Sequence, residues 1–212
     1  SLNNPNGVHG NSIGLIYISE EAGQRVRVVN ITSSSTGSSG IIHTYAGTGI
    51  GSYSGDGGTA TTAQFSYPQY LAVDTASNLF IADYYNRRIR KVTYTSKVIS
   101  TYVGTGTPSS LDNTAATSGT LNQPCGLYLV PTSNDLYISE YSGCKIRKVS
   151  GSTGALTTIA GTGIASTDPT AANGDGAAAT SATFKYPYGV WVSSNSGNIY
   201  IADTNNHRIR MV

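Results

Sequence analysis

Short apolar runs recur along this chain at similar distances from a proline, and together they divide it into four copies of one unit. The opening prolines are Pro5, Pro68, Pro124 and Pro187. An apolar run follows each of them, at residues 16–20, 79–83, 136–140 and 199–203. A third run, in which basic and apolar residues mix, lies at residues 25–29, 88–92, 145–149 and 208–212. A fourth run occurs three times, before Gly-Thr-Gly, at residues 42–46, 99–103 and 156–160.

These runs have the length and composition of β-strands. They are short, rich in β-branched and aromatic residues, and bounded by Gly, Asn and Ser. Four short strands joined by tight turns form an antiparallel meander, and meanders repeated radially form a β-propeller. The second run of each copy has three consecutive apolar residues, as in Ile16-Tyr17-Ile18, so both faces of its sheet must be covered. This favours blades packed face to face over a two-layer sandwich.

The pattern therefore predicts an all-β fold, a β-propeller of four-stranded antiparallel blades. We expect one such unit over residues 1–212, with blades near residues 1–49, 64–106, 120–163 and 183–212. The fourth copy stops after its third run and so lacks an outer strand of its own. Either the chain is a segment of a longer array, or a neighbouring molecule supplies that strand, because an unpaired edge invites strand addition.

The motif within each copy resembles the NHL repeat. The fourth copy carries it most fully, in residues 187–190 (Pro-Tyr-Gly-Val), 198–203 (Asn-Ile-Tyr-Ile-Ala-Asp) and 206–210 (Asn-His-Arg-Ile-Arg). Elsewhere Tyr70 replaces the glycine, and Glu20 and Glu140 replace the aspartate. The linkers at residues 55–58 and 174–176 are similar to those of secreted or cell-surface NHL arrays. The resemblance implies a propeller, usually of about six blades, and leaves the function open because this scaffold hosts many roles.

Composition favours an extracellular or cell-surface setting. Only 11% of the residues are charged, against about 25% in an average soluble domain, and the chain has 15 tyrosines. The net charge is +2, and ten of the 13 Lys and Arg residues are spread over the third runs rather than clustered as a nucleic-acid footprint would be. No apolar run is long enough to cross a bilayer. We therefore expect a protein that binds no nucleic acid and does not insert into a membrane.

An acidic residue in each copy is followed five residues later by a basic one. The pairs are Glu20 with Arg25, Asp83 with Arg88, Glu140 with Lys145, and Asp203 with Arg208. A catalytic site is needed once, whereas these pairs recur at one spacing in every copy. We expect them to brace hairpins as ion pairs or hydrogen bonds, each worth roughly 0–1 kcal/mol at an exposed position.

No residue set predicts catalysis, a metal or a cofactor. The resemblance implies that an enzyme of this type, similar to the peptide-amidating lyases, would hold zinc with histidines on central strands. Of the histidines His9, His43 and His207, only His9 falls in such a strand. Because zinc needs three or four converging ligands, we expect a protein that is not an enzyme.

Two cysteines and one sequon bear on the compartment. Cys125 and Cys144 fall in strand-end turns of the third copy, which favours an intrablade disulfide, with two free thiols as the alternative. Such a disulfide would add roughly 3 kcal/mol. Asn30-Ile31-Thr32 is a sequon that opens a polar loop at residues 33–40, and it predicts glycosylation of Asn30 in a secreted chain.

One position of the first strand varies while its surroundings repeat. It holds His9, Ala72, Tyr128 and Trp191. These side chains either plug an axial channel or form a binding face, and His9, Tyr128 and Trp191 are the candidate ligand-binding residues. For the whole chain we expect a non-enzymatic extracellular scaffold that associates with itself or with other propeller or extracellular proteins. The alternative is a lectin-like propeller that binds glycans or another ligand at the channel mouth.

Overall fold

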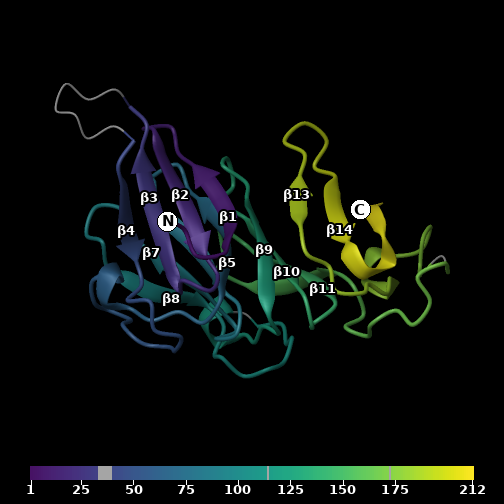
Figure 1. Cartoon of the computed structure of the whole chain (residues 1–212). Helices are drawn as coiled ribbons and strands as arrows, with labels where there is room; N and C mark the ends of the chain where they lie inside the picture. Colours follow the sequence, from purple (N-terminus) through teal and green to yellow (C-terminus); the bar gives the residue numbers. More distant parts are fainter. Residues whose placement is uncertain (33–39, 114, 172) are drawn as a thin grey trace. The chain divides into compact units, whose positions relative to one another are not determined.

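The computed structural model describes residues 1–32, 40–113, 115–171 and 173–212, and its strands form four antiparallel sheets (Figure 1). Within each sheet the strands follow one another in chain order, so each sheet is a meander, here called blades 1 to 4. The chain divides into two compact units, Ser1–Tyr102 and Val103–Val212. The predicted all-β fold with antiparallel propeller blades is confirmed, including the last blade with three strands.

Unit 1 holds blades 1 and 2. Blade 1 consists of β1 (Pro5–Gly10), β2 (Leu15–Glu20), β3 (Arg25–Asn30) and β4 (Ile42–Ala46). Blade 2 consists of β5 (Pro68–Val73), β6 (Leu79–Asp83), β7 (Arg88–Val92) and β8 (Ile99–Val103). The linker before blade 2 contains the 3₁₀ turn η1 (Ala60–Thr62). Most of the predicted polar loop, residues 33–39, lies outside the described residues.

Unit 2 holds blades 3 and 4. Blade 3 consists of β9 (Pro124–Leu129), β10 (Leu136–Glu140), β11 (Lys145–Val149) and β12 (Leu156–Ala160). Blade 4 consists of β13 (Val190–Val192), β14 (Ile199–Asp203) and β15 (Arg208–Met211). The 3₁₀ turns of this unit are η2 (Ala116–Ser118), η3 (Ala179–Ser181) and η4 (Thr204–Asn206).

Within each unit the two blades pack face to face. We call the face of blade 1 that packs on blade 2, and the equivalent face of every other blade, the rear face, and the opposite one the front face. In unit 1, Tyr17 and Val26 on the rear of blade 1 share a buried core with Leu71 and Ile81 on the front of blade 2. In unit 2 the corresponding core joins Ile146 of blade 3 to residues of blade 4 that include Val190 and Ile201. This packing explains why Leu79 and Ile81, on the front face of β6, are buried.

Candidate functional site

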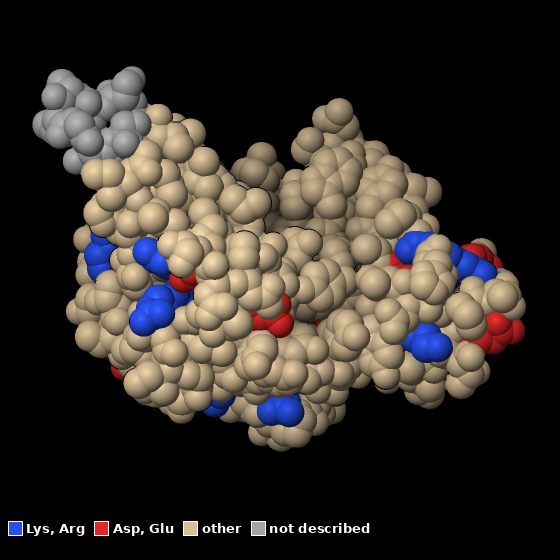
Figure 2. Space-filling view, in the orientation of Figure 1, with Lys and Arg blue, Asp and Glu red and all other residues tan. Residues whose placement is uncertain are grey.

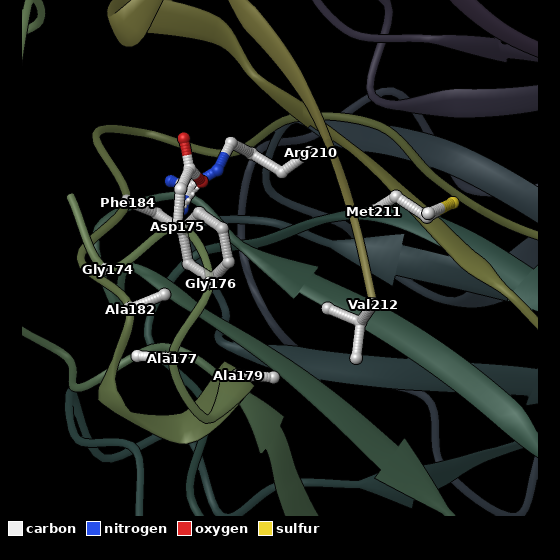
Figure 3. A pocket seen from close by; sticks show the side chains of 10 residues that line it. All are labelled: Gly174, Asp175, Gly176, Ala177, Ala179, Ala182, Phe184, Arg210, Met211 and Val212. Carbon is white, nitrogen blue, oxygen red and sulfur yellow. Dashed lines mark ion pairs between the residues drawn. The ribbon is translucent and has the colours of Figure 1, made fainter. Parts of the chain in front are cut away.

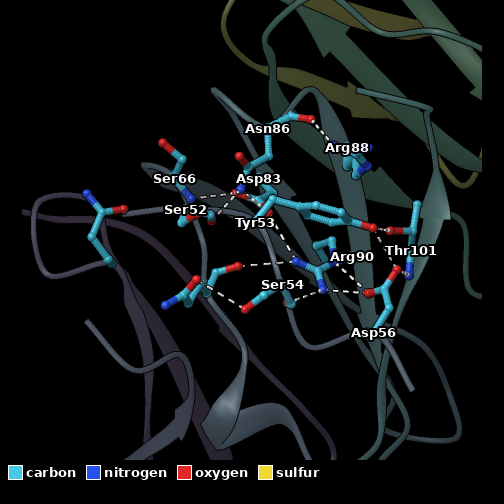
Figure 4. Close-up of polar contacts among 12 residues, drawn as sticks. Ser52, Tyr53, Ser54, Asp56, Ser66, Asp83, Asn86, Arg88, Arg90 and Thr101 are labelled. Carbon is cyan, nitrogen blue, oxygen red and sulfur yellow. Dashed lines mark hydrogen bonds and ion pairs between the residues drawn. The ribbon is translucent and has the colours of Figure 1, made fainter. Parts of the chain in front are cut away.

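A buried arginine joins the linker of blade 2 to its strands (Figure 4). The Arg90 guanidinium on β7 lies 3.3 Å from Asp83 Oδ2 and 2.5 Å from Asp56 Oδ1, and the Arg90 side chain is fully buried. Asp83, at the end of β6, also accepts hydrogen bonds from the Ser66 backbone N–H at 2.8 Å and from the Asn86 amide at 2.9 Å. One guanidinium therefore holds the linker, the entry to β5 and the β6–β7 hairpin together.

The same ion pair recurs in every blade, two residues further along than the sequence pattern indicated. The pairs are Glu20 with Arg27, Asp83 with Arg90, Glu140 with Arg147, and Asp203 with Arg210. The basic residues that the pattern predicted as partners lie opposite the acidic residues in the strand register. Their side chains donate hydrogen bonds to backbone carbonyls instead: Arg25 to Thr48, Arg88 to Asn86, Lys145 to Ser110 and Arg208 to Ala171. The expectation of exposed pairs was also wrong, because the acidic side chains are at most 3% exposed.

Burial governs the protonation of these carboxyls. It raises the pKa of Asp83 to about 6, although hydrogen bonds from Ser66 and Asn86 and the charge of Arg90 oppose the rise. Burial also raises the pKa of Glu140. At Asp56 burial acts in the same direction, but hydrogen bonds from Thr101 and the Arg90 charge outweigh it and lower the pKa. Because each carboxylate already accepts hydrogen bonds from the chain, the clusters are structural braces.

The linker that precedes a blade also holds the outer strand of that blade. In blade 2 the Gly57 N–H donates to the Ile99 carbonyl at 2.8 Å, and the Ile99 N–H donates to the Gly58 carbonyl at 3.0 Å. Further along β8, the Thr101 N–H donates to Asp56 Oδ2 at 3.0 Å. The strand β8 is thus clamped between β7 and the linker.

Blade 3 repeats this clamp with other side chains. Asn113 and Leu156 exchange both backbone hydrogen bonds, at 2.9 and 3.0 Å. The Thr158 hydroxyl donates to Asp112 Oδ1 at 2.8 Å, and the same carboxylate oxygen lies 2.7 Å from the Arg147 guanidinium. An aspartate that contacts both the buried arginine and the threonine of the outer strand is therefore common to the two blades.

Blade 4 keeps the clamp, but its fourth-strand position is a cavity of about 160 Å³ (Figure 3). Asp175, the counterpart of Asp56 and Asp112, forms an ion pair with Arg210. Gly176 and Ala179, the counterparts of Gly57 and Ala60, line the cavity together with Met211. The residues that hold an outer strand in blades 2 and 3 are therefore already in place around this position, which we call the strand slot.

The rear face of blade 4 exposes apolar side chains whose counterparts are buried. Ile209 on β15 is 71% exposed, whereas Ile89 and Ile146 at the same repeat position are fully buried. Met211 and Trp191 lie on the same face and are 62% and 50% exposed. On blade 1 the front face shows the same contrast, since Val8 is 69% exposed and its counterpart Leu71 only 2%. These are surfaces of the kind that blades use to pack on one another.

Two of the three predicted ligand-binding residues are brought together. Tyr128 on β9 and Trp191 on β13 make an edge-to-face contact with ring centroids 6.0 Å apart. Tyr128 also lines a groove of about 320 Å³ between blades 3 and 4. His9 lies in the other unit, where its Nδ1 is 2.8 Å from the Gly10 carbonyl oxygen.

The sequence pattern missed Tyr137, which lines the groove beside Tyr128. Its counterparts Tyr17 and Phe80 are buried, and the repeat therefore marked this position as core. The sequence does contain a sign that this position of blade 3 differs: in the outer strand, Ile159 stands in place of Tyr45 and Tyr102. The smaller side chain at that repeat position leaves more room beside Tyr137.

The predicted disulfide is wrong, because Cys125 and Cys144 are both buried free thiols. Cys125 Sγ lies 3.3 Å from Ser139 Oγ and 3.4 Å from the Pro187 carbonyl oxygen, whereas Cys144 Sγ lies 3.7 Å from the Tyr141 carbonyl oxygen. The two thiols thus contact different groups. Burial raises the pKa of Cys125 to about 12, which keeps this thiol protonated at neutral pH.

Asn30 ends β3, where its side chain caps a local turn. Asn30 Oδ1 accepts hydrogen bonds from the Thr32 N–H at 3.0 Å and from the Thr32 hydroxyl at 2.7 Å. Ile31 between them is 56% exposed. The sequon is therefore accessible from solvent, and glycosylation of Asn30 stays a prediction.

Charged groups are sparse on the face drawn in Figure 2, where most of the surface belongs to uncharged residues. Among the described residues, no group of three or more His, Cys, Asp or Glu side chains is placed to hold a metal ion. Helices long and apolar enough to cross a membrane are likewise absent from the described part of the chain.

Comparison with known proteins places this geometry in a family. NHL repeat-containing protein 2 of Bos taurus is 31% identical over 159 residues, which cover 71% of this chain and 21% of that protein. The chain thus spans about a fifth of the length of this curated relative. A protein of unknown function from Bacteroides thetaiotaomicron has a similar structure (TM-score 0.72, 18% identity), with 98% of this chain and 46% of that chain covered.

An auxiliary nutrient binding protein from Bacteroides ovatus is also similar (TM-score 0.70, 15% identity), with 100% of this chain and 48% of that chain covered. At such identities the two structures support the fold alone. The family model of the Teneurin NHL domain matches residues 8–212, nearly the whole chain. On this match, and on the blades and motifs described above, the chain belongs to the NHL-repeat family of the Teneurin NHL domain.

Proposed function

We propose that this chain is part of a non-enzymatic extracellular scaffold, and that its fourth blade is completed by a β-strand that it accepts into the strand slot. The strand slot carries this proposal. Asp175, Gly176 and Ala179 repeat the linker positions that hold β8 and β12, and they face β15 across the cavity. A strand added there gains main-chain hydrogen bonds on both of its edges.

The three outer strands of the chain define the sequence that fits the slot. Residues 42–46, 99–103 and 156–160 share Ile or Leu at the first position, Thr at the third and Ala or Val at the fifth. Ile99 and Leu156 at the first position are fully buried, and Thr101 and Thr158 at the third contact the linker aspartate. The partner strand therefore has the pattern Ile/Leu-x-Thr-x-Ala/Val.

The exposed apolar faces support a role in assembly. Ile209 on the rear of blade 4 and Val8 on the front of blade 1 occupy positions that are buried at blade-to-blade contacts elsewhere in the chain. Because a rear face packs on a front face within each unit, each of these exposed faces suits packing against a further blade of the same kind. The low charge and the accessible sequon at Asn30 favour an extracellular setting.

A fluorescently labelled peptide with the sequence of residues 98–106 tests the slot by anisotropy. We expect saturable binding, and we expect the Asp175→Ala variant to bind at least tenfold more weakly, which is about 1.4 kcal/mol. Asp112→Ala is the matched control, since it removes the same aspartate from blade 3, where β12 fills the position. A peptide with proline in place of Thr101 should not bind, because it lacks the N–H that reaches the aspartate.

Two results would contradict the proposal. One is equal binding of the native and proline-containing peptides. The other is an Asp175→Ala variant that, while folded by circular dichroism, binds the peptide as well as the Asp112→Ala control.

A further inference from the structure

The groove between blades 3 and 4 has an aromatic base. Tyr128 and Tyr137 are directly opposite each other in the register of β9 and β10, so both rings stand on the rear face of blade 3. Val192 and Ser193 of blade 4 line the other side of the cavity of about 320 Å³. Both tyrosines are only half-buried, which leaves part of each ring for a ligand.

The rim of the groove carries hydroxyl groups. Thr132 and Ser133 come from the turn between β9 and β10, and Ser194 comes from the turn between β13 and β14. All three residues are exposed. Hydroxyl side chains both donate and accept hydrogen bonds, so this rim suits a ligand that is itself rich in hydroxyls.

Charge narrows the ligand class further. Asp135 lines the groove, but its carboxylate already accepts a hydrogen bond from the Gly151 N–H at 2.8 Å and lies 3.5 Å from the Lys148 ammonium. None of the described residues that line the groove is Lys, Arg or His. Lys148 beside the groove is already paired with Asp135, so a phosphate or carboxylate ligand would find no unpaired cation among the described lining residues.

We propose that this groove binds one neutral sugar ring, a pyranose unit of a glycan. The tyrosine rings pack against the C–H groups of the sugar, and the hydroxyls of the rim bind the hydroxyls of the sugar. A ring with one apolar face and a hydroxylated edge matches the aromatic base, the polar rim and the absence of Lys, Arg and His from the described lining. The site belongs to unit 2, because in unit 1 the counterpart of Tyr137, Tyr17, is fully buried against Tyr45.

Trp191 gives this site a built-in optical probe. It is the single tryptophan of the chain, and its ring centroid lies 6.0 Å from that of Tyr128. We suggest titrating the protein with the methyl glycosides of glucose, galactose, mannose and N-acetylglucosamine while recording tryptophan emission. Saturation-transfer NMR on the same samples shows which face of the sugar touches the protein. At least one glycoside should bind saturably in the millimolar range, with transfer to its C–H groups.

Variants locate the binding. Tyr137→Ala should weaken binding at least tenfold, whereas Tyr128→Phe, which keeps the ring, should change it less than threefold. Thr132→Tyr places a bulky side chain on an exposed turn at the rim and should block binding without touching the core. Tyr85→Ala, an exposed tyrosine in unit 1, is the control and should bind as the native chain does.

The proposal is overturned if no glycoside changes the emission or receives saturation, or if Tyr137→Ala and Thr132→Tyr bind as tightly as the native chain. It is also overturned if a proline-rich peptide competes the sugars away at lower concentration, which would make the groove a peptide site. The groove shares no residue with the strand slot. Failure of this test therefore leaves the proposed strand addition standing, and the reverse also holds.

Discussion

The two blade-to-blade junctions within the units show how one repeat can give a closed contact or an open groove. In unit 1, Tyr17 is fully buried and meets Tyr45 edge to face, with ring centroids 4.8 Å apart. In unit 2, the counterpart Tyr137 is half-buried, Ile159 replaces the second tyrosine, and a groove of about 320 Å³ lies alongside. Both units share the buried ion pairs between the second and third strands, such as Asp83 with Arg90 and Glu140 with Arg147, so the difference arises from a few variable side chains.

The largest expected contrast comes from truncating the two equivalent tyrosines. Tyr17→Ala should lower the free energy of unfolding of the chain by about 3–5 kcal/mol, because it leaves a cavity at a fully buried position. Tyr137→Ala should cost only about 1–2 kcal/mol, since part of its ring already lies in water. Urea unfolding followed by circular dichroism measures both. Equal losses would mean that the groove closes in solution.

Removal of the buried arginine should destabilise blades 2 and 3 to a similar extent. Arg90→Ala and Arg147→Ala each leave buried acids without their cation, so each should cost about 3–5 kcal/mol. Arg27→Ala in blade 1 should cost less, because that side chain is 19% exposed and, among the described residues, forms an ion pair with Glu20 but with no linker carboxylate. Chemical denaturation of the three variants orders them. If Arg147→Ala lowers the free energy of unfolding far less than Arg90→Ala does, the buried ion pairs of the two units differ in their contribution to stability.

The raised pKa of Asp83 predicts an unusual pH dependence. Since its pKa is about 6 in the folded chain and 3.8 when unperturbed, the folded state holds the proton more tightly between these values. This carboxyl therefore contributes most to stability below pH 4, and the contribution is lost as the pH rises through 6, by up to about 3 kcal/mol. In Asp83→Asn that decline should disappear, so the stability deficit of the variant should shrink from pH 4 to pH 7. A deficit that grows with pH contradicts this.

The smallest effect concerns the cysteines, which unit 2 has and unit 1 lacks. Because Cys125 and Cys144 are free, a reducing agent should leave the free energy of unfolding unchanged. Two thiols should react with a thiol reagent in denaturant under non-reducing conditions, and Cys125 should react slowly in the native chain because burial raises its pKa. If no thiol reacts in denaturant, Cys125 and Cys144 form a disulfide after all.

The strands and their order could be predicted from the sequence because the repeat shows the same apolar pattern several times. The ion-pair partners could not, since residues 88 and 90 lie on the same face of β7 and sequence spacing alone cannot choose between them. In the folded chain Arg90 contacts both Asp83 and the linker carboxylate of Asp56. In the same way, Cys125 and Cys144 both fall in strand-end turns of one copy, which suggested a disulfide. In the folded chain their thiols contact different groups.

The candidate sites were visible in the sequence only in part. Variation at the first-strand position pointed to Tyr128 and Trp191, which do lie together. Tyr137 looked like core because its counterparts are core, and its exposure depends on side chains from another strand and another blade. The clamp that holds an outer strand relies partly on backbone groups of the linker, such as the N–H of Gly57 in blade 2, and these leave little trace in residue identity.

Hydrogen exchange at β15 tests the central claim, that blade 4 is prepared to receive a strand. In the free chain, the amides of Arg208–Met211 that face away from β14 should exchange far faster than those of β7 and β11, whose outer edges are paired. Saturation with the peptide of residues 98–106 should slow the exchange of these β15 amides at least tenfold and leave β7 and β11 unchanged. Exchange at β15 that stays the same with bound peptide would contradict the account.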